Sequence, residues 1–172
     1  MRHGTRIGVL AATAAVPLTA LAISACGGGG SGATAPPTTA SGKAATVGLA
    51  TEGNLGKILV DSQGRSLYLF QKDTGTTSQC AGACAAAWPP LRATGKPVVG
   101  TSLPASKIAT TARSDGKPQV TYNGHPLYRY SADQKPGDTN GQGLNAFGGA
   151  WFALSGDGNM VSGQGSGNGL GY

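Results

Sequence analysis

The sequence contains few charged side chains and few of the residues that bind metals or nucleic acids. Charged residues make up 12% of the 172 residues, about half the usual share. The Lys and Arg residues are scattered singly, so no basic cluster is present that would follow a phosphate backbone. No C-x-x-C pair and no C-x-x-C-H run occurs, which argues against a thioredoxin-like motif and a c-type haem attachment. We therefore expect no nucleic-acid partner and no cofactor.

Residues for catalysis are also scarce. His125 is the only histidine beyond the first few residues. The pattern Gly-x-Ser-x-Gly occurs only at residues 163–167, where the Gly-rich surroundings predict neither a preceding strand nor a following helix. We expect that the protein is not an enzyme.

The N-terminus has the three-part layout of an export signal. Residues 1–6 are basic, and residues 7–23 are apolar but shorter than the ~20 residues of a membrane span. Small residues at 24 and 25 precede Cys26, and this sequence resembles the bacterial lipobox, in which the cysteine is lipidated and the chain is cut before it. An ordinary secretory signal cut after residues 20–22 is the alternative. We predict a signal peptide at 1–25 and a lipid anchor on Cys26 that holds the protein at the outer side of the bacterial cell membrane.

Residues 26–45 comprise this cysteine and a linker. The linker contains Gly, Ala, Ser, Thr, Pro and a single Lys, so it has little apolar surface to bury and we expect it to be flexible. Its 19 residues would span about 25 Å. Removal of Arg2 and Arg6 with the signal leaves 11 basic against seven acidic side chains.

An internal repeat organises residues 46–162, with copies at 46–100 and 101–162. Each copy carries the motif Y-x-[FY]-x-x-D, and a tryptophan follows it. The matching residues are Gly64 and Gly124, Tyr68 and Tyr128, Phe70 and Tyr130, Asp73 and Asp133, and Trp88 and Trp151. Each copy is too small to bury its own core, so the repeat predicts two halves that share one core around a pseudo-twofold axis.

The hydrophobic pattern predicts a mainly β fold built from antiparallel meanders of six to eight short strands. In copy one we expect strands at 46–51, 57–60 and 65–71, and in copy two at 120–122 and 126–131 around an Asn-Gly hairpin turn. A helical turn is expected at 82–87, a last hairpin at 151–154 and 159–161, and a disordered tail at 163–172.

The repeated motif allows two interpretations. Residues i and i+2 of a strand share a face, so each aromatic pair lies on one side of its strand, with the Asp just past the strand end. In the first interpretation the aromatic residues pack the core and the Asp caps backbone N–H groups of the next loop. In the second they form an exposed platform for a sugar or another planar ligand.

Several motifs in order resemble a family of bacterial secreted-repeat lipoproteins of unknown function. These are the duplicated motif, the block CAGACAAAWPP at 80–90 and GDTNGQG at 137–143, so the resemblance covers residues 47–161 and the signal. It implies an extracytoplasmic location and supplies no catalytic residue. We expect a non-catalytic module that binds an envelope polymer or a small ligand, and a purely structural envelope protein is the alternative.

Cys80 and Cys84 are the pair that remains once Cys26 carries lipid. Exported proteins enter an oxidising compartment, so we expect a disulfide between these two cysteines. Their separation of four residues allows the Cα atoms to lie close enough for a bridge. The second copy has Gly143 and Phe147 at these places. A redox-active pair, or a metal site that adds His125 or Met160, is an alternative without motif spacing to support it.

Overall fold

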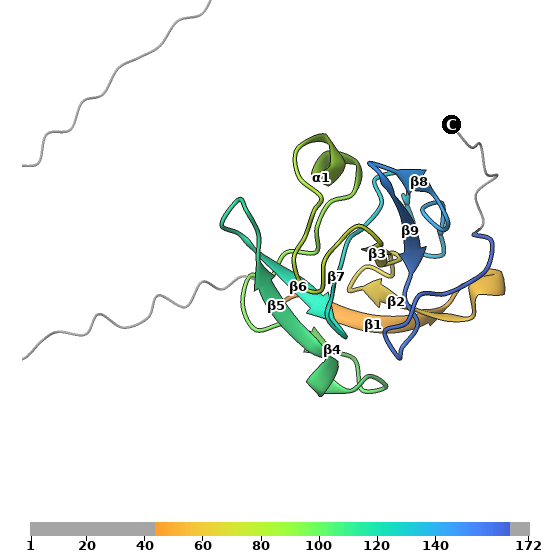
Figure 1. The fold of residues 1–172 in the computed structure, drawn as a ribbon. Coiled ribbons are helices and arrows are strands. Elements are labelled where there is room, and N and C mark those ends of the chain that lie inside the picture. Colours follow the sequence, from red (N-terminus) through yellow and green to blue (C-terminus); the bar gives the residue numbers. More distant parts are fainter. Residues whose placement is uncertain (1–43, 166–172) are drawn as a thin grey trace, which may run out of the picture. The chain divides into compact units, whose positions relative to one another are not determined.

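The computed structural model describes residues 44–165, which fold into short strands with little helix (Figure 1). The predicted signal, Cys26, most of the linker and the end of the tail lie outside the described residues. The strands are β1 (Thr46–Thr51), β2 (Lys57–Asp61), β3 (Tyr68–Phe70), β4 (Val98–Val99), β5 (Ile108–Ala112), β6 (Pro118–Tyr122), β7 (His125–Pro126), β8 (Asn145–Ala146) and β9 (Gly149–Ala153). The helices are α1 (Ala83–Ala87) and the 3-10 turns η1 (Gly53–Leu55) and η2 (Ala105–Lys107).

The strands form three small sheets, in the orders β2-β1-β4, β3-β9-β8 and β5-β6-β7. All pairs are antiparallel except β1 with β4, which run parallel. The mainly β fold predicted from the sequence is confirmed. None of the helices within residues 44–165 is long and apolar enough to cross a membrane.

Two predicted turns have the backbone conformation that their residues favour. Asn123 and Gly124 have φ values of 49° and 83°, which suits the two-residue turn between β6 and β7. Gly64 has φ of 75° in the turn after β2. Asp61 closes that turn, because its Oδ1 accepts hydrogen bonds from the Gln63 and Arg65 amides at 2.8 and 3.1 Å.

The pairing of β3 departs from a simple meander. The predicted third strand of copy one does not stay beside β1 and β2 but pairs with β9 of copy two, with Phe70 opposite Trp151. The equivalent exchange occurs in copy two, where the Arg129 amide donates to the Pro89 carbonyl at 2.9 Å. The motif segment of each repeat therefore lies against the tryptophan segment of the other.

Equivalent residues meet at the centre of this exchange. The Tyr68 amide donates to the Tyr128 carbonyl at 2.9 Å, and the Tyr128 amide donates to the Tyr68 carbonyl at 3.0 Å. Such a reciprocal pair between matching positions places a pseudo-twofold axis between them, as the repeat predicts. Both clusters of buried side chains draw on both copies, one aliphatic around Leu59, Leu67 and Leu127 and one aromatic around Trp88 and Trp151.

The last part of the chain contains one hairpin that the sequence did not reveal. β8 and β9 are joined by a tight turn at Phe147 and Gly148, whose φ values are 59° and 83°. The expected hairpin at 151–154 and 159–161 is present as a short pairing: Leu154 bridges Met160, and the Ser155 and Val161 amides donate to the Asn159 and Ala153 carbonyls at 2.9 Å each. α1 lies within the predicted helical turn at 82–87.

Candidate functional site

The motif residues of the two repeats are joined by crossed hydrogen bonds. The Tyr68 hydroxyl donates to Asp133 Oδ2 at 2.6 Å, and the Tyr128 hydroxyl donates to Asp73 Oδ2 at 2.8 Å. Each tyrosine is therefore paired with the aspartate of the other copy. The motif links the two halves in addition to shaping each one.

Each aspartate also fixes the loop that follows it. Asp73 Oδ1 accepts from the Gln79 amide at 2.8 Å, and Asp133 Oδ1 accepts from the Asn140 amide at 3.0 Å. Burial raises the pKa of both carboxyl groups above the ordinary value, although these hydrogen bonds oppose the rise. Burial and the nearby Asp133 carboxylate likewise raise the pKa of the Tyr68 hydroxyl, so this tyrosine stays neutral and acts as a donor.

Four aromatic rings form a continuous stack through the aromatic cluster. Trp88 and Trp151 lie parallel at its centre, with ring centroids 3.9 Å apart and an interplanar angle of 4°. Phe70 stacks on Trp151 at 4.1 Å, and Tyr130 stacks on Trp88 at 4.2 Å. The order of the rings therefore obeys the pseudo-twofold axis, which passes between the two tryptophans.

Two further rings meet this stack edge-on, and a glycine lets a loop approach it. Tyr68 meets Trp88 at 5.5 Å and 80°, and Tyr128 meets Trp151 at 5.2 Å and 88°. A Cβ atom at Gly141 would lie 2.8 Å from the Trp88 ring, so only glycine fits there. All of these rings are at most 2% exposed except Tyr130, which is half-buried. The rings contact one another, and no open groove runs along them.

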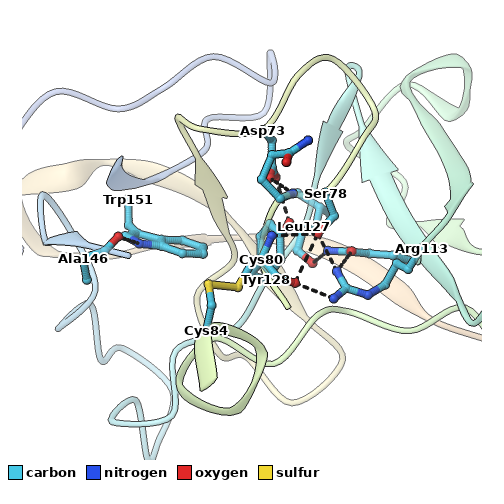
Figure 2. The surroundings of a disulfide bond; sticks show 11 residues. Asp73, Ser78, Cys80, Cys84, Arg113, Leu127, Tyr128, Ala146 and Trp151 are labelled. Atoms are coloured by element: carbon cyan, nitrogen blue, oxygen red, sulfur yellow. Dashed lines mark hydrogen bonds between the residues drawn. A yellow bond between two sulfur atoms is a disulfide. The ribbon is translucent and has the colours of Figure 1, made fainter. Parts of the chain in front are cut away.

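The disulfide between Cys80 and Cys84 lies in the aromatic cluster (Figure 2). Its Cα atoms are 5.2 Å apart, and the two residues are 0% and 6% exposed. The bridge thus joins the first turn of α1 to the loop that Asp73 fixes. Its burial leaves the sulfur atoms little access to an external thiol.

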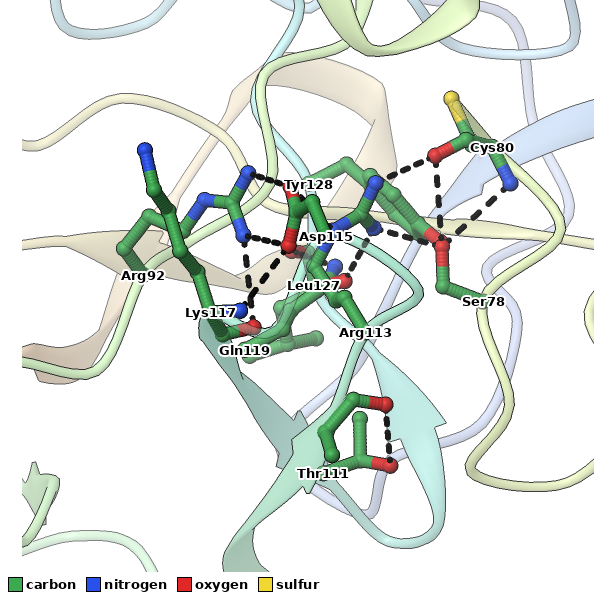
Figure 3. Close-up of polar contacts among 11 residues, drawn as sticks. Ser78, Cys80, Arg92, Thr111, Arg113, Asp115, Lys117, Gln119, Leu127 and Tyr128 are labelled. Carbon is green, nitrogen blue, oxygen red and sulfur yellow. Dashed lines mark hydrogen bonds and ion pairs between the residues drawn. The ribbon is translucent and has the colours of Figure 1, made fainter. Parts of the chain in front are cut away.

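A buried arginine ties this loop to the second repeat (Figure 3). Arg113, directly after β5, donates to Ser78 Oγ and Gln119 Oε1 at 2.6 Å each and to the Cys80 carbonyl at 2.5 Å. The Ser78 hydroxyl in turn donates to the Tyr128 hydroxyl oxygen at 2.7 Å, because the single Tyr128 proton is already donated to Asp73. The sequence did not single out Arg113, because a lone basic residue after a strand carries no signal of burial.

Within residues 44–165 no three His, Cys, Asp or Glu side chains lie close enough together to hold a metal ion. His125, which we considered as a metal ligand, lies in the short strand β7 and is half-buried. Met160 is 46% exposed, and its Sδ accepts from the Gln71 side chain at 3.5 Å.

A groove of about 880 Å³ lies away from the motif residues, between the edge strands β4 and β5. This volume is in the range of ligand-binding pockets. Val98 on its wall is 46% exposed. The lining residues are Gly95, Lys96, Pro97, Val98, Val99, Ala105, Ile108, Ala109 and Thr110.

The sequence analysis did not predict this groove. Its two walls come from segments 97–99 and 108–110, which belong to different repeats and to different sheets. The one available signal is the segment IATTA at 108–112, which is uncharged and in which Ile108, Thr110 and Thr111 are β-branched, as is typical of a strand.

A family model described as a secreted repeat of unknown function matches residues 50–92 and 109–155. The two matches coincide with the two copies of the motif and include both aspartates and both tyrosines. No curated protein and no solved structure matches the chain.

Proposed function

The chain belongs to the family of secreted repeats of unknown function, and on this premise we propose that it is a lipid-anchored, non-catalytic binding module of the bacterial envelope. Family membership accounts for an extracytoplasmic location. The anchor is Cys26, and the linker behind it would keep the duplicated β domain within about 25 Å of the membrane surface.

One observation favours the groove as the binding surface. The residues of the repeated motif are used inside the protein, where they pair with each other across the pseudo-twofold axis. The groove between β4 and β5 is instead concave, open and lined by exposed apolar side chains. Binding there would leave the shared core undisturbed.

The anchor is tested by the variant Cys26→Ser in the producing bacterium. We expect the wild-type chain to incorporate radioactive fatty acid and to sediment with membranes. The variant should do neither. Labelling that persists in Cys26→Ser would show that the lipid is attached elsewhere, and a wild-type chain without label would show that the signal is of the ordinary secretory type.

The groove is tested with the complete mature chain carrying Cys26→Ser, mixed with isolated membrane and wall fragments. Val98→Asp places a charge in the groove, and Met160→Asp is the matched control because both side chains are 46% exposed. We expect Val98→Asp to reduce co-sedimentation at least tenfold and Met160→Asp to leave it unchanged. Equal sedimentation of both variants would exclude the groove. Absence of sedimentation of the chain with the unaltered groove would overturn the proposed binding function.

A further inference from the structure

We infer that the groove binds an extended polypeptide strand, which adds to the free edge of β5. This inference rests on the proposed function, because it assigns the class of ligand to the same groove. Strand addition requires unpaired main-chain N–H and C=O groups that face the ligand, together with side-chain contacts at alternate positions.

The first wall offers such groups from β5. In β6 the Pro118 carbonyl accepts from the Ala93 amide, and the Val120 amide donates to the Leu91 carbonyl, so these positions face away from β5. In β6 it is therefore Gln119 and Thr121 that point their main-chain N–H and C=O groups toward β5, where their partners are Thr111 and Ala109.

The alternate residues of β5 must then point their main-chain groups across the groove. These are Ile108 and Thr110, and both line it. Within residues 44–165 neither residue has a main-chain hydrogen bond on that side.

The second wall offers a similar edge from β4. The Val98 amide donates to the Ala45 carbonyl at 2.9 Å, and the Gly100 amide donates to the Val47 carbonyl at 2.8 Å, both toward β1. In a parallel ladder the intervening residue faces the other way, so Val99 turns its N–H and C=O groups toward the groove. A strand between the walls would have partners on both sides.

The β5 edge lacks the usual protection against strand addition. Proteins blunt exposed edges with Lys, Pro or bulges, but residues 108–112 contain none of these, and their pairing with β6 is regular over five positions. An edge that is left open in this way is suited to a polypeptide, since a sugar polymer, even one with N-acetyl groups, lacks main-chain N–H and C=O groups that alternate at the spacing of a strand.

Charge favours a ligand of a different kind over a second copy of this chain. Lys96 is the only charged residue that lines the groove, so an acidic side chain on the ligand would be stabilised beside it. The β5 strand of a second copy, Ile108–Ala112, has no acidic side chain that could meet Lys96.

The test uses random twelve-residue peptides displayed on phage, selected against the complete mature chain carrying Cys26→Ser. Recovered peptides are then measured against Thr110→Pro and Thr110→Ala. Proline removes an outward N–H that is not part of the β5–β6 ladder, so the edge strand tolerates it, whereas alanine keeps the N–H. Circular dichroism and thermal unfolding verify that both variants fold.

We expect the recovered peptides to be rich in β-branched residues with Asp or Glu, and to bind Thr110→Pro at least tenfold more weakly than Thr110→Ala. Hydrogen exchange of the Ile108 and Thr110 amides should slow at least tenfold with peptide, while exchange at Ala109 and Thr111 stays unchanged. Failure to recover peptides, or equal binding to both variants, would overturn the inference. Slowed exchange at these amides caused by self-association or by wall glycan fragments in the absence of peptide would do the same.

The two proposals can fail separately. If envelope binding is lost in Val98→Asp but is the same in Thr110→Pro and Thr110→Ala, the groove is the binding surface and the ligand is not an added strand. If Val98→Asp leaves envelope binding intact, the groove is not the binding surface. If the unaltered groove binds no envelope fragment at all, the proposed function itself is wrong.

Discussion

Replacing Tyr68 with Phe tests whether the crossed hydrogen bonds hold the two repeats together. The change removes one hydroxyl that donates to Asp133 Oδ2 and keeps the ring that meets Trp88. A hydrogen bond to a charged group contributes about 1.5–3 kcal/mol. Asp133 is only 4% exposed, so water cannot readily take the place of the hydroxyl, and we expect a loss of about 2–3 kcal/mol in the free energy of unfolding.

The matching change in the other repeat should cost less. Asp73, one partner of Tyr128, is half-buried, so solvent can hydrate the abandoned oxygen in Tyr128→Phe. Ser78, the second partner of this hydroxyl, keeps its hydrogen bond from Arg113. We expect a loss of about 1–2 kcal/mol there. Tyr130→Phe is the control, because within residues 44–165 the Tyr130 hydroxyl has no hydrogen-bond partner, and its loss should stay below about 0.5 kcal/mol.

Urea unfolding of the complete mature chain, followed by tryptophan fluorescence, measures these differences. A double-mutant cycle of Tyr68→Phe with Asp133→Asn isolates the coupling between the two side chains, which we expect to be about 1.5–2 kcal/mol. If Tyr68→Phe costs no more than Tyr130→Phe, the crossed pairs do not stabilise the fold and the reasoning is refuted.

Three other changes test separate features. Burial raises the pKa of Asp133, so the folded chain binds the proton of this carboxyl more tightly than the unfolded chain does. The free energy of unfolding should therefore fall as the pH rises from 3.8 through the raised pKa. Urea titrations at several pH values should show that Asp133→Asn flattens this fall. Removing the disulfide with Cys80→Ser and Cys84→Ser should lower the free energy of unfolding by about 2 kcal/mol. As a control, a reductant should lower the thermal midpoint of the wild type and leave that of the variant unchanged. Phe147→Asn should stabilise the protein by up to about 1 kcal/mol, because Phe147 is 45% exposed with φ of 59° and Asn tolerates that conformation; an unchanged midpoint in thermal unfolding would contradict this.

The repeat was visible in the sequence because its signals are local. A Tyr, an aromatic residue and an Asp at fixed spacing need no knowledge of the partner strand, and Asn123-Gly124 specifies its turn through backbone conformation alone. The mainly β fold follows from the alternation of apolar residues, whereas the division of the shared core into an aliphatic and an aromatic cluster was not predicted.

The exchange of segments between repeats could not be predicted in the same way. Tyr68 would share a face with Phe70 whether β3 paired with β2 or with β9, so the hydrophobic pattern does not choose between the two partners. The choice depends on the tryptophans, which can stack at 3.9 Å only if each motif segment crosses to the other half. The groove could not be predicted from the sequence for a related reason, since it forms where the edge strands of two different sheets approach each other.

The crossed pairing has a consequence for how the two repeats depend on each other. Two unlinked copies of one unit could make the same contacts only as an isologous dimer, whose folded fraction would depend on concentration. Joining the copies in one chain replaces that equilibrium with a fixed effective concentration. Because the copies are joined, the sequence of one half can also change without the same change in the other. The disulfide of the first repeat and the Phe147 hairpin of the second are such a difference, since they occupy corresponding places in the two halves.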